Sequence, residues 1–299
     1  MLNWLVIGIG DISTKRIILA ILAEPRSRLV GLVTRSADKA KVYGVRAWTS
    51  LESALQESDA DAVYVATPVA LHAPQTIACL QAGKHVLCEK PVAMNFAQAA
   101  SMVAAADRCG RTLGIAYYRR TYPKVQRAKQ LLASGAIGTP VLGEGMCHSW
   151  FQPKGEREWL LDPALAGGGP LYDIGSHRID LLNYFFEMPI RAVGAIGNAI
   201  HQTRVEDNAT GLIEYAGGVR GIVDVRWHSR VARDEFRIRG TEGELELTPL
   251  NSPDLVWPGG RELLPAHQNL HYPCIANFVG SVLDGEALLA SGTSSIWTD

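Results

Sequence analysis

One short segment gathers the side chains best suited to proton transfer. The segment GGGPLYDIGSHRID places three glycines before Asp173, His177 and Asp180. At about 100° per residue, these side chains and Tyr184 fall on one side of a helix. Histidine moves protons readily near neutral pH, and an acid one turn earlier can orient it or stabilise its cation. The pattern fits a general acid/base site; a polar, solvated helix face is the alternative.

A metal site is a weaker interpretation of His177. No other His or Cys stands at ligand spacing to it in the sequence, so we expect no bound metal. The five cysteines are scattered, odd in number and without a CxxC pair. The N-terminus MLNWLVIGIG enters a strand at once, without an export signal. These features favour a reduced, cytoplasmic protein.

A second segment, HVLCEKP, places Glu89, Lys90 and Pro91 at the carboxyl end of a predicted strand. In open α/β sheets, ligands bind outside the carboxyl ends of the strands. Lys90 could there hold a substrate oxygen or the nicotinamide region of a cofactor. A solvated lysine in a strand-to-helix turn is an equally good interpretation of this tripeptide.

The first strand leads into a glycine turn. VIGIGDIS reads as Gly8-x-Gly10-x-x-Ser13 between a strand and a helix. The first glycine permits a tight turn, the second lets the backbone approach a pyrophosphate, and the helix N-terminus offers free N–H groups. Ser13 replaces the usual third glycine or alanine but is small enough for close packing. The turn predicts a dinucleotide-binding site.

The end of the second strand bears on the choice of cofactor. NAD-binding sites usually place Asp or Glu there, whereas this chain has Thr34, Arg35 and Ser36. Arginine can pair bidentately with a 2′-phosphate. We therefore expect NADP(H). NAD remains possible because Asp38 is close enough to bind a ribose, and the alternative interpretation of Arg35 is that it opens a surface loop.

The elements around these segments indicate an α/β protein. Over residues 1–118, short apolar strands alternate with helices, which predicts a doubly wound parallel sheet of the Rossmann type. Beyond YYRRTYP the chain becomes β-rich, with closely spaced strands and the turns AGG and TEG. This predicts a second α/β domain over residues 119–299, with a mostly antiparallel sheet and helices on one face.

Composition excludes several classes of protein. The chain has 299 residues, of which 47% are hydrophobic and 20% charged, and its net charge is −1. No basic or acidic excess points to nucleic acid or a membrane. The longest early apolar run, IILAILA, is too short to span a bilayer.

Taken together, the motifs resemble one family. The Gly-x-Gly strand, ATPVALHAPQTIACLQAGKHVLCEKP and GGGPLYDIGSHRIDLL occur in this order. They are similar to the glucose–fructose oxidoreductase / inositol dehydrogenase / MocA family over nearly the whole chain. The resemblance implies a Rossmann domain and an α/β domain whose open sheet makes oligomer contacts, giving a homodimer or homotetramer. It also implies NAD(P)-dependent oxidation or reduction of a sugar, polyol or similar small molecule.

The resemblance also assigns roles to residues. The family's motif lysine matches Lys90, and its Asp and His match Asp173 and His177, which are the expected catalytic residues. His177 would move the proton of the alcohol, Lys90 would bind its oxygen, and the glycines would let the backbone approach the nicotinamide. The Lys90–Pro91 bond is expected to be cis.

The full expected sites are larger. The expected cofactor-binding residues are Gly8, Gly10, Asp11, Ile12, Ser13, Thr34, Arg35, Ser36, Thr67, Pro68, His72, Glu89 and Lys90. The expected substrate-binding residues are Lys90, Tyr118, Arg119, Trp150, Asp173 and His177. For Trp150 packing is the stronger interpretation, and for His72 a structural role at a helix start is equally good.

One departure and two rival functions remain. The family continues with a C-terminal helix that packs toward the first domain, and this chain stops at SGTSSIWTD, where we expect that helix to start. We therefore expect a short member of the family or a chain that has lost its end.

The rival functions are a non-catalytic dinucleotide-sensing regulator and a glycosidase that retains NAD.

Overall fold

The computed structural model describes residues 1–299, apart from the side chain of Ala37. It divides into two compact units, the first made of Met1–Tyr118, His267–Trp297 and Asp299 and the second of Arg119–Ala266 and Thr298. The second unit thus covers Arg119–Ala266 and Thr298, whereas the sequence predicts a second domain over residues 119–299. Within the described chain, no helix has both the length and the apolar character needed to cross a membrane.

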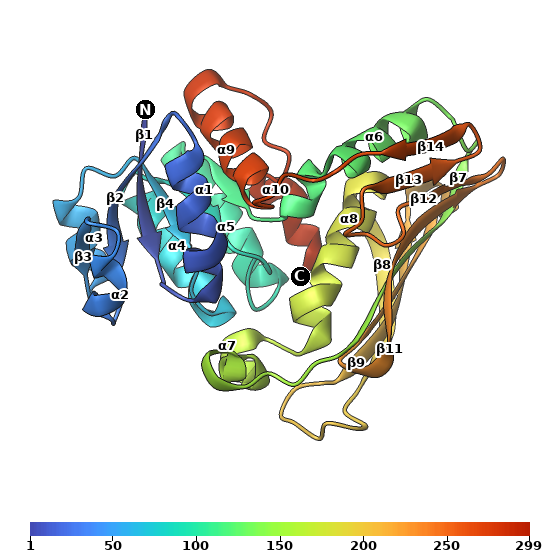
Figure 1. Ribbon diagram of the computed structural model, residues 1–299, viewed down its shortest axis with the longest axis horizontal. Helices are drawn as coiled ribbons and strands as arrows, with labels where there is room; N and C mark the ends of the chain where they lie inside the picture. The colour runs from blue at the N-terminus through green and yellow to red at the C-terminus, as the bar shows by residue number, and fades with distance from the viewer. The chain divides into compact units, whose positions relative to one another are not determined.

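The first unit contains a six-stranded parallel sheet in the order β3-β2-β1-β4-β5-β6. The strands are β1 Leu2–Ile7, β2 Ser27–Val33, β3 Arg46–Trp48, β4 Ala62–Val65, β5 His85–Cys88 and β6 Leu113–Ile115. The helices are α1 Ile18–Ala23, α2 Ala37–Lys41, α3 Leu51–Glu57, α4 His72–Gln81, α5 Phe96–Cys109, α9 Tyr272–Asp284 and α10 Gly292–Ser295 (Figure 1). Single helical turns precede α1 and α4, η1 Ser13–Ile17 and η2 Val69–Leu71. The predicted parallel sheet is confirmed.

Both faces of this sheet are buried, which explains the continuous apolar runs of its strands. Along β1, Trp4 packs into the cluster that contains Ile18 of α1 and Phe278 of α9. The neighbouring Leu5 packs into the opposite cluster, which contains Met102 of α5. The alternation follows from the period of two along a strand. Layers of helices on both faces therefore hold the carboxyl ends of the strands in fixed positions.

Two helices of the first unit come from residues 272–295, and the segment SGTSSIWTD, where the family's C-terminal helix is expected to start, forms α10 and the turn η7 Ile296–Thr298. The helix α9 packs on the sheet of the first unit, where the Phe278 ring lies 5.3 Å from that of Trp4. Its boundaries follow ordinary signals, because Pro273 stands in its first turn and Gly285 ends it with a φ of +73°. This helix was not predicted from the sequence.

The second unit contains an eight-stranded sheet in the order β14-β13-β12-β11-β7-β10-β9-β8. Only β7 and β10 pair in parallel among its described strands, so the predicted mostly antiparallel sheet is confirmed. The strands are β7 Pro140–Trp150, β8 Pro189–Gly197, β9 Asn208–Tyr215, β10 Arg220–Arg226, β11 His228–Gly240, β12 Glu244–Glu246, β13 Asp254–Trp257 and β14 Gly260–Leu263. The helices are α6 Pro123–Ala133, α7 Pro163–Ala166 and α8 Ser176–Phe186, with the short helical segments η3 Tyr118–Thr121, η4 Gly155–Leu161, η5 Leu171–Gly175 and η6 Ala216–Gly218. The turn η7 Ile296–Thr298 ends the chain's helical segments.

Helix α8 lies along one face of this sheet (Figure 1). A Cβ atom at Gly143 of β7 would lie 2.6 Å from Leu182, and one at Gly145 would lie 2.9 Å from Arg178. The glycines thus let α8 approach β7 closely, and the odd-numbered positions of β7 face the helix. Because successive side chains alternate, the even-numbered positions face the other side of the sheet.

Candidate active site

The turn after β1 has the conformation that the glycine spacing predicts. Gly8 has a φ of +87°, and a Cβ atom there would lie 2.7 Å from the carbonyl oxygen of Ala66. The Ser13 hydroxyl donates a hydrogen bond of 2.6 Å to the Gly8 carbonyl, which closes the turn. A Cβ atom at Gly10 would meet no described atom within 4 Å. The turn therefore leaves open space beside Gly10, at the start of a helical segment.

The two residues between Gly10 and Ser13 are exposed. The Asp11 carboxylate forms an ion pair of 2.6 Å with Lys15, one turn later. The Ile12 side chain is 38% exposed, unusual for so large an apolar residue. Lys15 thus offsets the one negative charge on this turn, at the end of a helix that attracts anions.

At the end of β2, the backbone fixes the loop that carries Arg35. The Thr34 N–H donates to the Trp48 carbonyl at 2.9 Å, and the Ser36 N–H donates to the Thr34 hydroxyl at 3.1 Å. The Arg35 side chain is exposed. Asp38 forms an ion pair of 2.8 Å with Lys41 instead of with Arg35. The loop therefore presents a guanidinium group whose charge the nearest acid does not neutralise.

At the end of β4, His72 holds two turns together. It is 1% exposed, and its ring nitrogens lie 2.8 Å from the Pro91 carbonyl oxygen and 2.9 Å from that of Thr67. Burial lowers the pKa of His72, against the opposing effect of these two carbonyls. The Thr67 hydroxyl donates to Gln75 at 2.7 Å, and Pro68 precedes the following helical turn. His72 therefore positions both turns, which supports the structural interpretation of this residue.

At the end of β5, a buried network surrounds Glu89. Its carboxylate accepts hydrogen bonds from the Tyr64 hydroxyl at 2.8 Å and the Lys90 N–H at 3.1 Å, and lies 3.3 Å from Nε2 of His271. Burial favours the neutral acid, but His271, Lys90 and Tyr64 outweigh it and lower the pKa of Glu89. The Lys90–Pro91 bond is cis, as the resemblance implies. The Glu89 carboxylate thus holds the backbone of Lys90 in place.

Two residues of this network were not found from the sequence. Tyr64 is fully buried inside β4, and burial raises its pKa well above the usual value. His271 comes from the segment just before α9, and its ring lies 4.6 Å from that of Tyr118. Nothing near His271 in the sequence marks it as a partner of Glu89, because 182 residues separate the two.

In the second unit, the three glycines serve the start of α8. The Glu206 carboxylate accepts hydrogen bonds from the N–H groups of Gly169, at 2.8 Å, and Leu171, at 3.1 Å. A Cβ atom at Gly169 would lie 2.1 Å from the Glu206 carbonyl oxygen, and one at Gly167 would lie 2.4 Å from the Tyr172 ring. Contacts inside this unit therefore account for the glycines. Their expected role, to let the backbone approach the nicotinamide, stays a prediction. Glu206 was not found from the sequence.

The predicted face of α8 is buried. His177 is 4% exposed and Asp173 is half-buried, so the alternative of a solvated polar face is wrong. The turn that carries Asp173 is a π-helical segment, Leu171–Gly175, which continues directly into α8. Such insertions often occur at functional sites because they change the direction of side chains. Asp173 and His177 thus lie one turn apart on a continuous helical segment.

The remaining acid of that face has a structural partner. The Arg120 guanidinium donates to both Asp180 oxygens, at 2.6 and 3.1 Å, and both side chains are buried. Burial raises the pKa of Asp180 to about 6, although Arg120 opposes the shift. The Tyr184 hydroxyl accepts a hydrogen bond of 2.9 Å from Gln126, and Arg120 lies over its ring. Asp180 and Tyr184 therefore anchor α8, which leaves Asp173 and His177 as its candidates for chemistry.

The comparisons with known proteins agree with this arrangement. Residues 2–117 match the oxidoreductase family with an NAD-binding Rossmann fold, and residues 125–246 match the GFO/IDH/MocA C-terminal domain. The 1,5-anhydro-D-fructose reductase of Ensifer adhaerens is 31% identical over 312 residues, covering 100% of this chain and 93% of that protein. The chain belongs to the Gfo/Idh/MocA oxidoreductase family. It is an NAD(P)-dependent oxidoreductase of this family.

Solved structures of the Gfo/Idh/MocA family share the fold throughout. The aldose-aldose oxidoreductase of Caulobacter crescentus, complexed with glycerol, is 27% identical with a TM-score of 0.89, and the match covers 99% of this chain and 94% of that one. GenD2 from gentamicin A biosynthesis, in complex with NAD, is also 27% identical, with a TM-score of 0.85 over 99% of this chain and 90% of that one.

The expected site residues of this family member fall into separate groups. The expected cofactor residues, Lys90 among them, follow the carboxyl ends of β1, β2, β4 and β5 in the first unit, and Tyr118 of the same unit follows β6. Arg119, Asp173 and His177 belong to the second unit, and Arg119 lies 3.4 Å from the Asn251 side chain. Trp150 holds an even-numbered position of β7, on the face away from α8, with Arg230 over its ring at 4.0 Å. The structure therefore does not bring Trp150 together with His177.

The glycine turn gives a first test of the cofactor site. We expect Gly8→Ala to lower the free energy of unfolding by about 1–3 kcal/mol, because alanine is strained at positive φ and its methyl group would press on Ala66. Gly10→Ala is the matched control. It should fold with nearly unchanged stability but bind cofactor more weakly, since its methyl group occupies the space open to a pyrophosphate. Urea denaturation and cofactor titration of both variants measure this, and equal stability of the two would contradict it.

Proposed function

We propose that this chain is an NADP(H)-dependent oxidoreductase that acts on a sugar or polyol, with His177 as the general acid/base. The observation that carries the proposal is His177 itself, 4% exposed on α8 and one turn after Asp173. The substrate class is supported by the names of the relatives, which act on anhydrofructose and on aldoses. The reaction converts a secondary alcohol to a carbonyl, or the reverse.

In this proposal each residue has one role. A nicotinamide cofactor, when bound, would supply the hydride chemistry. In oxidation, His177 takes the proton from the substrate hydroxyl as the carbon loses its hydride, and in reduction it returns that proton. Asp173 orients His177 and stabilises its cation. Lys90, held by the Glu89 network, hydrogen-bonds the same substrate oxygen and stabilises the negative charge that develops on it.

The preference for NADP(H) rests on the loop after β2. Arg35 is exposed, and the carboxylate nearest to it in sequence, Asp38, is paired with Lys41. An unneutralised guanidinium suits a 2′-phosphate, and the absence of an acid directly after β2 removes the usual partner of the ribose hydroxyls of NAD. The space beside Gly10 fits the pyrophosphate of either cofactor.

Replacing Arg35 tests this preference. We expect Arg35→Ala to weaken NADPH binding about 10- to 100-fold, since a charge-assisted hydrogen bond contributes about 1.5–3 kcal/mol, and to leave NADH binding nearly unchanged. Arg28→Ala is the matched control, because Arg28 is an exposed arginine near the start of the same strand. Fluorescence titration with both cofactors measures the effect. Tighter binding of NADH by the unmodified protein would contradict the proposal.

A screen of sugars and polyols then tests the reaction itself. The expected result is a substrate-dependent change in NADPH absorbance that reverses when the product is supplied. Release of a sugar without net change in the cofactor would support a glycosidase instead. Cofactor binding without any turnover would support a sensor.

A further inference from the structure

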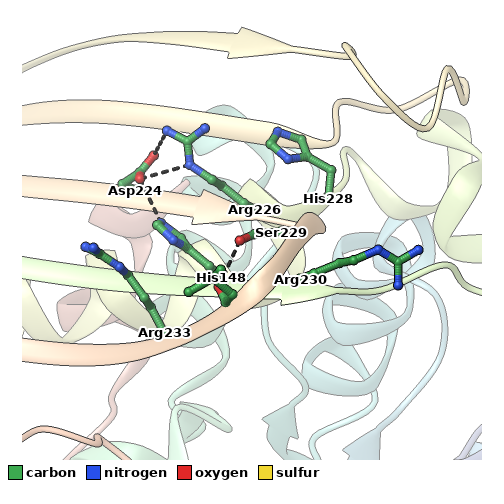
Figure 2. A pocket seen from close by; sticks show the side chains of 8 residues that line it. His148, Asp224, Arg226, His228, Ser229, Arg230 and Arg233 are labelled. Carbon is green, nitrogen blue, oxygen red and sulfur yellow. Dashed lines mark hydrogen bonds and ion pairs between the residues drawn. The ribbon is translucent and has the colours of Figure 1, made fainter.

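Three polar side chains in a cavity of the second unit satisfy one another. The volume of this cavity is about 560 Å³, and Figure 2 shows the residues around it. The Asp224 carboxylate accepts hydrogen bonds from His148 at 2.8 Å and from Arg226 at 3.0 and 3.1 Å. His148 belongs to β7, and the other two residues belong to β10. Their hydrogen bonds therefore serve to join these two strands.

The buried side chain of His271 in the first unit has a different balance. It is 3% exposed, and its Nδ1 atom is buried without a hydrogen-bond partner among the described residues. Its Nε2 atom lies 3.3 Å from Glu89, and because an ionised carboxylate only accepts, Nε2 carries the hydrogen. Burying a polar ring costs free energy unless its hydrogen bonds are made. The one hydrogen bond described for this ring goes to Glu89.

Glu89 transmits this contact to Lys90. Its Oε1 atom accepts from His271 and from the Tyr64 hydroxyl, while its Oε2 atom accepts the Lys90 N–H at 3.1 Å. Burial raises the pKa of Glu89, and the hydrogen bond from His271 is the largest of the effects that lower it. Without His271 the neutral acid would therefore be favoured. A neutral acid is a weaker acceptor for the Lys90 N–H than a carboxylate is.

The other titratable groups described around Glu89 come from several elements. They are Tyr64 of β4, His72 of α4, Cys88 of β5, Lys90 and, beside Tyr64, Cys274 of α9. Burial raises the pKa of Tyr64 and of Cys88 and lowers that of His72, so these three groups stay neutral near neutral pH. The ionisation of Glu89 therefore responds mainly to His271 and Lys90.

The segment that carries His271 is fixed to η1, the helical turn that follows the glycine turn. The Asn269 side chain donates to the Arg16 carbonyl of η1 at 2.8 Å, and its oxygen accepts the His271 N–H at 3.1 Å. The Arg16 side chain in turn donates to the Gln268 carbonyl at 3.3 Å. Asn269 and His271 therefore connect two segments that the proposed function places around the cofactor, the start of η1 and Lys90.

We propose that His271 is a positioning residue for Lys90, which it holds through Glu89, and that Asn269 fixes His271 against η1. This role rests on the proposed function, in which Lys90 binds the substrate oxygen. Misplacing a reacting group by about 1 Å can lower a rate about 100-fold. A change at His271 should therefore act on turnover rather than on the affinity for the cofactor.

The titration of Glu89 tests the contact without cofactor or substrate. NMR of the full chain, labelled at the glutamate carboxyl carbons, follows this group, and Glu89→Gln assigns its signal. We expect His271→Phe, which keeps a ring beside Tyr118 but has no donor, to move the midpoint of Glu89 to higher pH. His271→Gln, whose amide can donate, should restore much of the original midpoint. An unchanged midpoint in His271→Phe overturns the proposal.

Circular dichroism confirms that each variant folds. His271→Asn, whose shorter amide lies farther from Glu89, replaces the phenylalanine variant if that variant does not fold. It is expected to move the Glu89 midpoint in the same direction, and a midpoint equal to that of the unmodified chain overturns the proposal in this case too.

Kinetics with NADPH and the best substrate from the sugar and polyol screen test the effect on Lys90. His271→Phe should lower kcat about 10- to 100-fold and leave the dissociation constant of NADPH within about threefold, while His271→Gln recovers most of the loss. Gln268→Ala is the matched control, because Gln268 is exposed and meets Arg16 through its backbone carbonyl. An unmodified kcat in His271→Phe, or a loss no larger than that of Gln268→Ala, overturns the proposal.

The two measurements separate this inference from the proposed function. A chain that oxidises or reduces no sugar or polyol contradicts the proposed function, and the Glu89 titration still decides whether His271 controls that carboxylate. The double variant Asn269→Ala/His271→Phe should be no slower than His271→Phe, since both changes act through the same contact. Additive losses overturn the part assigned to Asn269.

Discussion

Replacing His177 by alanine is expected to lower kcat about 10²- to 10⁴-fold while leaving the dissociation constant for NADPH unchanged. Proton transfer to or from the substrate oxygen accounts for this loss, and the cofactor site lies in the first unit, whereas His177 lies in the second. His177→Gln should lose as much activity, because an amide can hydrogen-bond but cannot carry the proton. Steady-state kinetics and cofactor fluorescence on the same preparations separate the two effects.

The matched control for this experiment is His267→Ala. His267 is exposed. Its Nδ1 lies 2.9 Å from the Asn269 carbonyl oxygen, and its ring stacks on that of Tyr272 at the start of α9. Its loss should leave kcat within about twofold, as for most surface substitutions. A His177→Ala variant that folds, binds NADPH and turns over at the unmodified rate would remove His177 from the mechanism.

The parts of the fold that the sequence predicted are those with local signals. Strands such as β1 and β4 are buried on both faces and are mainly apolar, and β1 is followed directly by the Gly8 turn. The missed strand β3 has only three residues, two of them exposed. The missed strand β8 is an edge strand that is exposed on both faces, so its residues show no inward and outward alternation. Such segments are defined by pairing with a neighbour, which a local pattern does not record.

The candidate site divides in the same way. The Gly8 turn could be predicted from the sequence. Its positive φ and its close approach to the Ala66 carbonyl require a glycine, and that glycine stands directly after the first strand. The partners that hold Lys90 and α8 in place could not. His271 meets Glu89 across 182 residues, and Arg120 meets Asp180 across 60, so only the folded chain brings them together. Local spacing thus predicts a turn that requires glycine better than the distant residues that support Lys90 and α8.

The second large effect is expected on stability, when the buried Arg120–Asp180 pair is broken. Arg120→Met should lower the free energy of unfolding by about 3–5 kcal/mol near neutral pH, because it leaves a buried carboxylate without its counter-ion. Arg127→Met is the matched control in the same region. Arg127 pairs with Glu262 at 3.0 Å but is 38% exposed, so its loss should cost less than about 1 kcal/mol. Urea denaturation measures both, and equal losses would contradict the role of the buried pair.

The pH dependence separates the charge of Asp180 from the packing of Arg120. Burial raises the folded-state pKa of Asp180 from 3.8 to about 6, so folding favours the neutral acid. Its stabilising contribution is therefore complete below about pH 4 and is lost as the pH rises through 6. Without Arg120 the pKa rises further, and the deficit of Arg120→Met relative to the unmodified chain should grow from pH 4 to pH 8. The double variant Arg120→Met/Asp180→Leu, which has no charge to bury, should recover most of that stability and show no such growth. A deficit that is the same at every pH, or a double variant no more stable than the single one, would mean that Arg120 acts through packing alone.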